Sequence, residues 1–426
     1  MKRILLIAFH FPPFSGSSGI QRSMSFCRYL PEHGWHVTVL TVQARAYVKT
    51  DANQLADIPA TTRVVRAFGL DSARHLAIRG RYLRFTALPD QWISWLPDAL
   101  AKGRRVIKSD SVSAIVSTYP IATAHLIGYG LKRFTGLPWI ADFRDAMIDP
   151  DFPEDAAQRR AYARVEARVM AHATRAVFAS PGSMNMYRER YPDSGNRLRV
   201  VENGFDEASF PAYSAPSATP AADGPITLLH SGLIYPSERD PTAFFDALAE
   251  LKRAGRIDGN RLRVVLRASG HVPQFSTMTK DRNIDDIVTF AAAIPYREAL
   301  SEMMSADALL VLQARNCNHL IPAKLYECFR ARRPIVALTD PAGDTASKLA
   351  SAGIDTLAGL DDVAGIRNLI ERVLRDVRAG RLPVVRQEAI DAANRRTKAR
   401  ELAEILSEIA APGSGSHSGT KRTPDA

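Results

Sequence analysis

The stretch ITLLHSGLIYPSERDPTAFFDALAELKRAGRIDGNRLRVVLRAS, residues 226–269, contains a complete strand–helix–strand unit. The β-rich run ITLLHSG is followed, after a loop, by the helical pattern PTAFFDALAELKRAG and then by a second β-rich run, RLRVVLRAS. Strands that alternate with helices of this length are typical of βαβ units, which build parallel sheets covered by helices. The stretch therefore predicts an α/β fold with a parallel sheet.

The same alternation occurs in both halves of the chain. Ile20, Met24, Cys27 and Leu30 lie on one face of a predicted helix that closes at Gly34. Further strands are predicted at residues 3–9, 36–42, 63–68, 113–118, 307–313 and 333–339, and a further helix at residues 296–306. We therefore expect two open α/β sheets, one in each half.

The length of the chain also predicts two domains. A chain of 426 residues is too long for a single hydrophobic core. The segment PAYSAPSATPAADGP, residues 211–225, has few bulky apolar side chains and is rich in Pro, Ala and Ser, which indicates a linker or an exposed loop. We therefore place one domain at residues 1–205 and the second at residues 206–385.

The end of the chain predicts a helix and a tail. Leu402, Ile405, Leu406 and Ile409 form an apolar stripe with helical spacing, so one long helix over residues 386–411 is expected to pack on another part of the chain. The segment after it, residues 412–426, is rich in Gly and Ser and is predicted to be a disordered tail.

Composition narrows the classes of protein. The formal net charge is +11, which favours anionic partners such as nucleotides, acidic lipids or nucleic acid, although a soluble protein can also simply be basic. The three cysteines, Cys27, Cys317 and Cys328, have neither disulfide nor metal-ligand spacing, which fits a reducing cytoplasm. The apolar run at the N-terminus has no cleavage site, and no run approaches the roughly 20 residues that span a bilayer. We expect a soluble or peripheral protein.

Open parallel sheets bind ligands at the carboxyl ends of their strands, so the loops there are the candidate sites. After the first strand, Gly16 and Gly19 would let backbone amides approach an anion at a helix N-terminus, or would only form a tight turn. In the second half, Gly232 permits a close turn, and Arg239 could clamp a phosphate or could pair with a neighbouring carboxylate.

The segment NHLIPAKLYECFRARRPIVAL, residues 318–338, is a second candidate in the same half. Pro322 suits the first turn of a helix, where the amides around Ile321 point outward and partial positive charge gathers. Lys324 opposes the helix dipole there, so its position favours a bound anion. Glu327 lies one turn further on the same face and could accept hydrogen bonds from two neighbouring hydroxyls. The alternative is an ordinary Lys–Glu pair.

A third loop, IADFRDAMIDP, follows an apolar strand of the first half. Asp142, Arg144 and Asp145 would face any ligand at the carboxyl end of that strand, or would only pair with one another.

Five segments in this order resemble GT-B fold glycosyltransferases of the large retaining family 4. They are FPPFSGSSGIQRSMSFCRYLPEHGWHVTVLT (11–41), STYPIATAHLIGYGLKRFTGLPWIADFRDA (117–146), VVENGFDEASF (200–210), LLHSGLIYPSERDPTAFFDAL (228–248) and LIPAKLYECFRARRPIVAL (320–338). The resemblance covers about residues 1–410. Within the family, the chain is similar to a subgroup with DFRD and iPAKLYE motifs.

The resemblance implies two Rossmann-like domains facing each other across a cleft, with a C-terminal helix that crosses back to the N-terminal domain. The second domain would bind a nucleotide-sugar donor as co-substrate, without a further cofactor or a metal. Glu327 would hold the donor ribose, Arg239 and Lys324 would neutralise the diphosphate, and Tyr296 would lie near the base. The further donor-binding residues implied are Gly16, Gly19, Gly232, His319, Leu320 and Ile321.

On the acceptor side, the resemblance places Asp145 near the transferred sugar or the acceptor hydroxyl, with Asp142 and Arg144 beside it. Asp145, Arg239 and Lys324 would be the catalytic residues of a transfer that retains the anomeric configuration. The leaving diphosphate would be stabilised by positive side chains and a helix end. The expected setting is cell-surface polysaccharide or glycolipid synthesis.

Three positions depart from the family pattern, and one of them is Met147, which stands after DFRDA where the subgroup usually has a tryptophan. His319 stands where many members have the first of two glutamates, and Leu233 stands where an arginine often follows the donor-loop glycine. A scaffold that binds the donor without turnover is therefore one alternative. A sugar-nucleotide epimerase on the same double sheet is another, although the sequence offers no acidic residues evidently placed for proton abstraction. A nicotinamide oxidoreductase is disfavoured because no G-x-G-x-x-G follows either first strand.

The segment at residues 74–97 mixes basic and aromatic side chains: Arg74, Arg79, Arg81, Arg84, Tyr82, Phe85, Trp92 and Trp95. Such a mixture suits an anionic membrane surface or a lipid-linked phosphate, and we predict peripheral contact with the inner face of the cytoplasmic membrane. A glycan or polyprenyl-linked saccharide is the acceptor expected. Aromatic residues at helical spacing can also be core. No nucleic-acid-binding motif accompanies the segment, so a nucleic-acid partner is not expected.

Overall fold

The structure is a computed structural model that describes residues 2–16, 19–150, 152–211 and 224–410. The predicted linker at residues 211–225 lies almost wholly outside the described residues, and the predicted tail at residues 412–426 lies entirely outside them.

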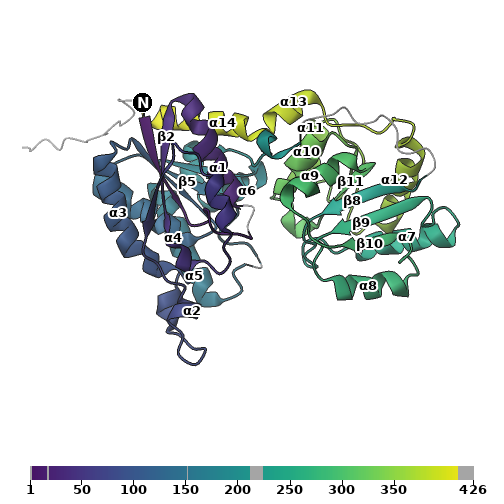
Figure 1. Cartoon of the computed structure of the whole chain (residues 1–426), viewed down its shortest axis with the longest axis horizontal. Coiled ribbons are helices and arrows are strands. Elements are labelled where there is room, and N and C mark those ends of the chain that lie inside the picture. Colours follow the sequence, from purple (N-terminus) through teal and green to yellow (C-terminus); the bar gives the residue numbers. More distant parts are fainter. Residues whose placement is uncertain (1, 17–18, 151, 212–223, 411–426) are drawn as a thin grey trace, which may run out of the picture. The chain divides into compact units, whose positions relative to one another are not determined.

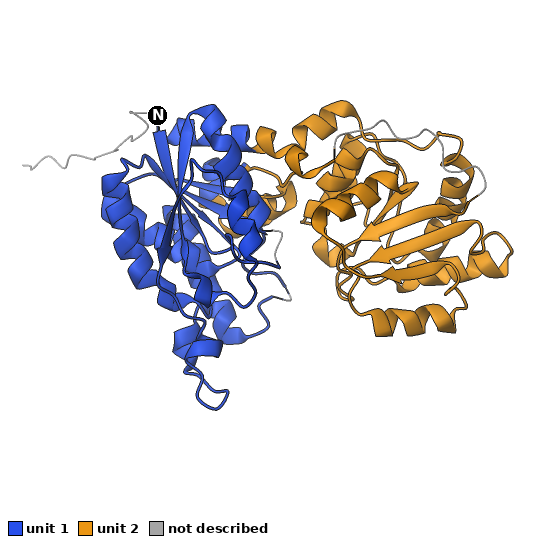
Figure 2. Cartoon of the chain, in the orientation of Figure 1, with its two compact units in different colours: residues 1–177, 194–199, 399–426 blue, residues 178–193, 200–398 orange. Residues whose placement is uncertain are grey.

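The chain forms two compact units, which are described separately below (Figure 2). Unit 1 consists of Met1–Val177, Ser194–Arg199 and Ala399–Ala426, and unit 2 consists of Phe178–Asp193 and Val200–Lys398. Residues 178–193 and 200–205 thus belong to unit 2, although the sequence pattern places them before the domain boundary.

Unit 1 is built on a seven-stranded sheet with the order β3-β2-β1-β4-β5-β6-β7 (Figure 1). Its strands are β1 Lys2–Ala8, β2 Trp35–Val42, β3 Arg63–Ala67, β4 Ala114–Thr118, β5 Trp139–Phe143, β6 Arg175–Phe178 and β7 Leu198–Val200. Strand β1 runs parallel to both neighbours, with Ile4 opposite Val37 of β2 and Leu6 opposite Val116 of β4. Because β1 is central, residues Ile4–Ala8 are fully buried and form an uninterrupted apolar run.

Helices connect these strands and cover the sheet. They are α1 Gly19–Tyr29, α2 Ser72–His75, α3 Leu96–Ser109, α4 Ala122–Thr135 and α5 Ala156–His172. The α-helical part of the predicted first helix ends at Tyr29, and a 3-10 turn at Leu30–His33 carries it to Gly34.

Unit 2 is built on a six-stranded sheet with the order β10-β9-β8-β11-β12-β13, and every neighbouring pair is parallel. Its strands are β8 Ile226–Ser231, β9 Leu262–Arg267, β10 Val288–Ala291, β11 Ala308–Gln313, β12 Ile335–Thr339 and β13 Leu357–Ala358. Leu228 and Leu229 are successive residues of β8 that belong to different apolar clusters, so both faces of the sheet are buried.

The helices of unit 2 are α6 Pro181–Arg190, α7 Thr242–Arg253, α8 Val272–Asp281, α9 Tyr296–Ser305, α10 Ala323–Ala331, α11 Asp344–Ser351, α12 Val363–Asp376 and α13 Gln387–Ala392. The last helix, α14, spans Arg395–Ile409, and its part from Ala399 onward belongs to unit 1. There, Trp35 Nε1 donates a hydrogen bond to Ser407 Oγ at 3.3 Å, and Arg175 pairs with Glu408.

The prediction of one long helix after residue 386 is wrong, because the chain forms two helices, α13 and α14. The break has a physical cause. Phe205 N donates to Ala393 O at 3.0 Å, and Arg395 N donates to Phe205 O at 2.9 Å, so these groups bond to a neighbouring segment and not within a helix. Asn394 then accepts a hydrogen bond from Arg396 N at 2.9 Å, as a side chain at a helix start often does.

The predicted fold class is confirmed by these two parallel, helix-covered sheets. Among the described residues, the helices are all too short or too polar to cross a membrane.

Candidate functional site

The carboxyl ends of β8 and β11 separate at the middle of the sheet of unit 2. Strand β8 pairs with β9 over six residues, but its pairing with β11 stops after Leu229 and Leu309. The chain leaves β8 toward β9 on one side, while β11 lies on the other side. Such a reversal of strand order opens a crevice, which is where open α/β sheets bind their ligands.

His230 lies at this point, and sequence reasoning did not single it out. Its ring nitrogen Nδ1 is 3.0 Å from Leu310 O. A carbonyl oxygen can only accept, so Nδ1 carries the hydrogen and Nε2 is the acceptor of the ring. Within the described residues this buried Nε2 has no hydrogen-bond partner. Burial lowers the pKa of His230 to about 4, and the neighbouring Arg239 and Lys324 cations lower it further, so the ring is neutral at pH 7.

Gly232 follows β8 directly and lies against Lys324, so the structure brings together two loops that the sequence presents as separate candidates. Its φ of +135° is a conformation that residues with a side chain rarely adopt. A Cβ at Gly232 would lie 3.5 Å from Lys324 Nζ. The bare backbone therefore lies beside a lysine ammonium, a surface that suits an anionic ligand.

Lys324 projects from the first turn of α10. Pro322 stands at the N-cap, and among the described residues α10 has no side chain that caps its free amides. The partial positive charge of the helix end and the full charge of Lys324 therefore lie together. Lys324 Nζ is 3.8 Å from Glu327 Oε2, so the two charges are close but do not form a tight ion pair.

Glu327 is 9% exposed, and only one of its two carboxylate oxygens has a hydrogen-bond partner among the described residues. Its Oε1 accepts a hydrogen bond of 2.6 Å from the Tyr296 hydroxyl, at the start of α9. Its Oε2 is buried and has no hydrogen-bond partner among the described residues. Burial and the Glu327 carboxylate raise the pKa of Tyr296 well above its ordinary value, so the hydroxyl keeps its proton and donates. One carboxylate oxygen is thus hydrogen-bonded by the protein, and the other still lacks a donor, which a ligand hydroxyl could supply.

Arg239 lies on the same loop as Gly232 and folds back on it. Its Nη1 donates to Leu233 O at 2.6 Å, and its guanidinium lies 5.6 Å from the centre of the Tyr235 ring. These contacts hold the arginine within the loop that follows β8, and its charge is close enough to lower the pKa of His230.

The loop before α10 is held by its carbonyl groups. His319 O accepts hydrogen bonds from Ser180 Oγ at 2.6 Å and Ser183 Oγ at 3.0 Å, the first at the N-cap of α6 and the second in its first turn. Leu320 O accepts from Gln313 Nε2 at 3.0 Å, and the Ile321 side chain is buried in the core. The buried Ile321 side chain therefore does not form the site, whereas Leu320, whose side chain is half-buried, stays a predicted donor contact.

Of the predicted site residues of unit 1, Asp142 has a structural role, whereas Arg144 and Asp145 do not share its contacts. Asp142 is paired inside the unit, because Arg22 on α1 donates to its two oxygens at 3.0 and 2.7 Å, and Thr118 Oγ1 donates at 3.0 Å. We therefore assign Asp142 to holding α1 on the sheet. Sequence reasoning missed Arg22 as its partner.

Arg144 and Asp145 lie differently. The Arg144 guanidinium packs on Gly19, where a Cβ would lie 2.1 Å from Nη1, so a side chain at this position would displace the arginine. Gly16 has a φ of +100° in the same loop. Asp145 is exposed.

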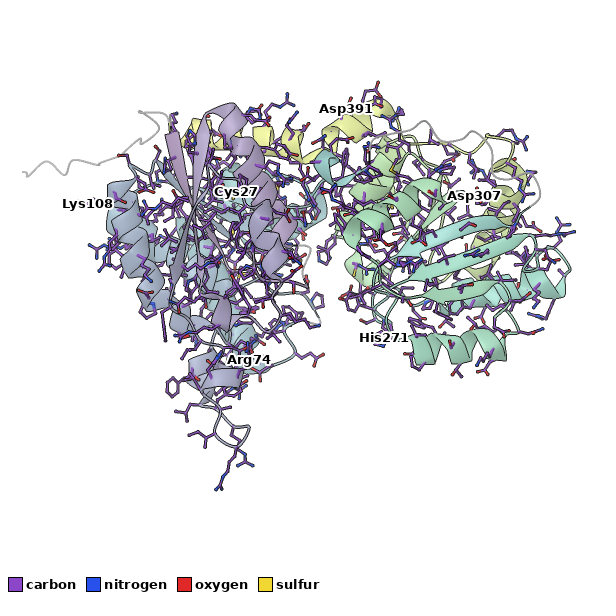
Figure 3. All side chains as sticks on the ribbon, viewed as in Figure 1. Cys27, Arg74, Lys108, His271, Asp307 and Asp391 are labelled. Atoms are coloured by element: carbon purple, nitrogen blue, oxygen red, sulfur yellow. The ribbon has the colours of Figure 1, made fainter. Side chains whose placement is uncertain are left out.

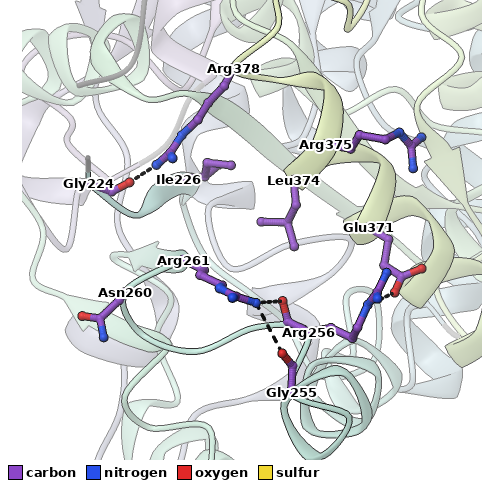
Figure 4. Close-up of a pocket in the computed structure, with 10 residues that line it drawn as sticks. All are labelled: Gly224, Ile226, Gly255, Arg256, Asn260, Arg261, Glu371, Leu374, Arg375 and Arg378. Atoms are coloured by element: carbon purple, nitrogen blue, oxygen red, sulfur yellow. Dashed lines mark hydrogen bonds and ion pairs between the residues drawn. The ribbon is translucent and has the colours of Figure 1, made fainter. Parts of the chain in front are cut away.

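A cavity of about 580 Å³ lies at the other end of the unit 2 strands, near Ile226 and Arg261 (Figure 4). It is rich in arginine, but these side chains are already engaged. Arg256 Nε donates to Glu371 at 2.9 Å, and Arg261 donates to the carbonyl of Gly255 at 3.3 Å. The cavity contains none of the predicted site residues, so we do not assign it to the candidate site.

Among the described residues there is no group of three or more His, Cys, Asp and Glu side chains that could hold a metal ion. Metal independence stays a prediction.

Comparison with known proteins supports glycosyl transfer. Residues 18–204 match the family model of the glycosyl transferase 4-like domain. A search of curated proteins gives no match.

Solved structures show the fold of the whole chain. Sucrose-phosphate synthase from Thermosynechococcus elongatus superposes with a TM-score of 0.66 at 16% identity, covering 96% of this chain and 99% of that chain. WaaG, a glycosyltransferase involved in lipopolysaccharide biosynthesis, gives 0.61 at 13% identity, covering 95% and 99%. Trehalose 6-phosphate synthase from Burkholderia multivorans gives 0.61 at 12% identity, covering 96% and 97%. Residues 18–204 are therefore similar to the glycosyl transferase 4-like domain, and the whole chain has the two-sheet fold that GT-B glycosyltransferases share.

Proposed function

We propose that this chain transfers a sugar, with retention of configuration and without a metal, from a nucleoside-diphosphate sugar bound by unit 2. One observation carries the proposal. The buried Oε2 of Glu327 has no hydrogen-bond partner among the described residues, and it lies near Lys324, which in turn lies against Gly232 at the strand crevice. A carboxylate oxygen without a partner is unfavourable in the free protein, and a ligand hydroxyl would satisfy it.

The donor would occupy the crevice in a defined direction. Its ribose hydroxyls would donate to Glu327, near the Tyr296 end of the site, which would lie toward the base. Its diphosphate would lie over Gly232 and the N-terminus of α10, where Lys324 supplies a full positive charge. Arg239 would add a second cation from the loop after β8. The neutral His230 would accept a hydrogen bond from a ligand hydroxyl through Nε2.

These groups would also promote the reaction. When the bond between the sugar and the diphosphate breaks, negative charge develops on the leaving phosphate. Arg239, bonded to Leu233 O, and the α10 amides are held in place before reaction, so they would stabilise this charge without reorganisation, and Lys324 would add its charge beside them. Asp145, exposed on unit 1, would be available to the acceptor hydroxyl.

The acceptor is proposed to be a glycan or a polyprenyl-linked saccharide, used for cell-surface polysaccharide or glycolipid synthesis at the cytoplasmic face of the membrane. Two observations support this choice. The fold is similar to that of a glycosyltransferase involved in lipopolysaccharide biosynthesis, and the chain carries a formal net charge of +11.

The test begins with calorimetric titration of UDP, GDP, ADP and CMP, followed by the matching nucleotide sugars with a panel of lipid-linked and free saccharides. The expected result is that one nucleoside diphosphate binds and that its sugar donor releases it in the presence of an acceptor. The anomeric proton signal of the product reports retention. Donor binding without release of the nucleoside diphosphate by any acceptor would instead favour the non-catalytic scaffold, consistent with Leu233 and His319 replacing family residues.

A further inference from the structure

One segment of unit 1 exposes apolar side chains in sequence. Every residue from Ile78 to Phe85 is exposed. The exposed fractions are 79% for Ile78, 66% for Leu83 and 71% for Phe85, and Tyr82 reaches 42%. Exposed large apolar residues are unremarkable when they are scattered, but a contiguous group marks a surface that meets a partner.

The backbone holds these side chains on a narrow hairpin below α2, residues 76–85, whose last two residues begin the 3-10 turn Arg84–Ala87 (Figure 1). Ile78 N donates to Arg81 O at 2.8 Å, and Arg81 N donates to Ile78 O at 3.0 Å. Between them, Arg79 and Gly80 have φ angles of 53° and 76°, which forms the tight two-residue turn typical of hairpins.

The base of the hairpin is fixed, while its tip projects. Asp71 accepts hydrogen bonds from Ala73 N and Arg74 N, and the Arg74 side chain donates to Tyr47 O at 2.6 Å. In Figure 3, Arg74 lies beside the unit 1 core and the chain beyond it extends away with its side chains spread outward. The hydrogen bonds at residues 71–74 therefore fix the base of the hairpin on unit 1, and the tip projects from that base.

The hairpin is also strongly basic. No acidic residue occurs between Asp71 and Asp90, whereas Arg74, Arg79, Arg81 and Arg84 lie in that interval. Arg84 pairs with Asp155, and Arg79 and Arg81 stand exposed at the turn. The exposed apolar side chains are therefore flanked by positive charge.

The two tryptophans of the predicted contact segment do not take part. Trp95 is fully buried, and the Trp92 ring lies 4.6 Å from the ring of Phe9 in the unit 1 core. The predicted surface at residues 74–97 is thus wider than its continuous exposed run, which ends at Phe85.

We propose that this hairpin inserts into the interface of an anionic lipid bilayer. Ile78, Leu83 and Phe85 would enter the boundary between headgroups and acyl chains, and Arg79 and Arg81 would reach lipid phosphates. A protein partner is disfavoured because a stable interface buries about 800 Å² on each side, more than a ten-residue tip readily offers. Nucleic acid is disfavoured because it would leave the exposed aliphatic side chains of Ile78 and Leu83 without apolar contact, since only Tyr82 and Phe85 could stack on bases.

The experiment is flotation of the full chain with vesicles of phosphatidylcholine alone or with one quarter phosphatidylglycerol, at low and high salt. The expected result is binding to the anionic vesicles that weakens with salt. Arg79→Glu/Arg81→Glu should weaken it by at least about 25-fold, from about fivefold for each arginine lost. Ile78→Ser/Leu83→Ser/Phe85→Ser should weaken it by at least about tenfold.

A matched control is Arg104→Glu/Arg105→Glu, which changes the net charge equally on the exposed face of α3 in the same unit. This variant should bind nearly as the wild type does. Equal loss in both arginine variants would mean that net charge alone drives binding and would overturn the proposal. Absence of binding to anionic vesicles would overturn it too, as would a wild type that self-associates through the hairpin, seen by sedimentation velocity. None of these readouts depends on a sugar donor, so the result stands apart from the proposed transfer activity.

Discussion

Replacing Glu327 by glutamine should affect folding and ligand binding in opposite directions. In the free protein, Tyr296 still has an oxygen to donate to, since the glutamine carbonyl can take the place of Oε1. The buried, unpartnered Oε2 is replaced by a neutral amide. The 3.8 Å contact with Lys324 is lost, but that lysine side chain is 40% exposed.

The magnitudes of these two effects decide whether the free energy of unfolding of the variant rises or falls. A buried polar group without a partner costs about 1–3 kcal/mol, and more when it is charged. An ion pair as exposed as that of Lys324 contributes at most about 1 kcal/mol. The free energy of unfolding of the free variant should therefore equal that of the wild type or exceed it by about 1–2 kcal/mol.

Nucleotide binding should weaken at the same time. Because the glutamine carbonyl oxygen faces Tyr296, its NH2 group stands where Oε2 was and cannot accept from a ligand hydroxyl. One charge-assisted hydrogen bond of about 2 kcal/mol is therefore lost, roughly thirtyfold in affinity. At a concentration 100 times the wild-type dissociation constant, a nucleoside diphosphate stabilises the wild type by about 2.7 kcal/mol. The same concentration would stabilise the variant by only about 0.9 kcal/mol.

Thermal unfolding with and without the nucleotide measures both effects. Glu302→Gln is the matched control, because Glu302 lies on the same helix as Tyr296 but both its oxygens are paired with Arg267, at 2.9 and 2.5 Å. That control should lower the melting temperature and keep the nucleotide-induced shift. If Glu327→Gln behaved like Glu302→Gln, Glu327 would be a structural residue and the donor site would be misplaced.

Three further results are expected. Gly232→Ala forces a side chain into a φ of +135° and should weaken nucleotide binding measurably by calorimetry, whereas Gly255→Ala, also at positive φ but with open space around it, should not. Asp142→Asn should lower the urea-derived free energy of unfolding by about 3–5 kcal/mol because it leaves Arg22 buried without its charge partner, and Arg22→Met in the same chain should restore part of that loss. His125 is fully buried and its pKa is lowered to about 4 by burial, so the folded state stays unprotonated while the unfolded chain takes up a proton below its ordinary pKa of 6.5. Stability should therefore fall by about 2 kcal/mol between pH 7 and pH 5, and His125→Gln should remove that part of the dependence; parallel pH curves for the two proteins would contradict it.

The fold was predictable because hydrophobic periodicity is a local signal. The strand at Ile226–Ser231 and the helix at Thr242–Arg253 lie within a residue or two of their predicted bounds. The single helix predicted after residue 386 failed for the opposite reason, since its break depends on Phe205, which is far away in sequence.

The candidate site was predictable only in part. Lys324 and Glu327 stand one turn apart on one helix, and Gly232 follows a strand, so their chemistry could be read locally. His230 looks like an ordinary strand residue, because its special position depends on the strand order β9-β8-β11. Asp142 looks like a ligand-facing acid, because its partner Arg22 lies 120 residues earlier.

Whether each polar atom already has a hydrogen-bond partner gives an independent way to tell residues that bind a ligand from residues that only stabilise the fold. Asp142 accepts hydrogen bonds at both oxygens, so a ligand could bind it only by breaking an interaction that the fold already has. Glu327 and His230 each have one atom fixed by the protein and the other buried without a partner among the described residues. The fixed atom holds the side chain in one orientation, so a ligand would not have to order it, and the open atom makes the empty site less favourable than the filled one. Substitutions at Glu327 and His230 should therefore reduce binding more than folding, and substitution at Asp142 should do the reverse.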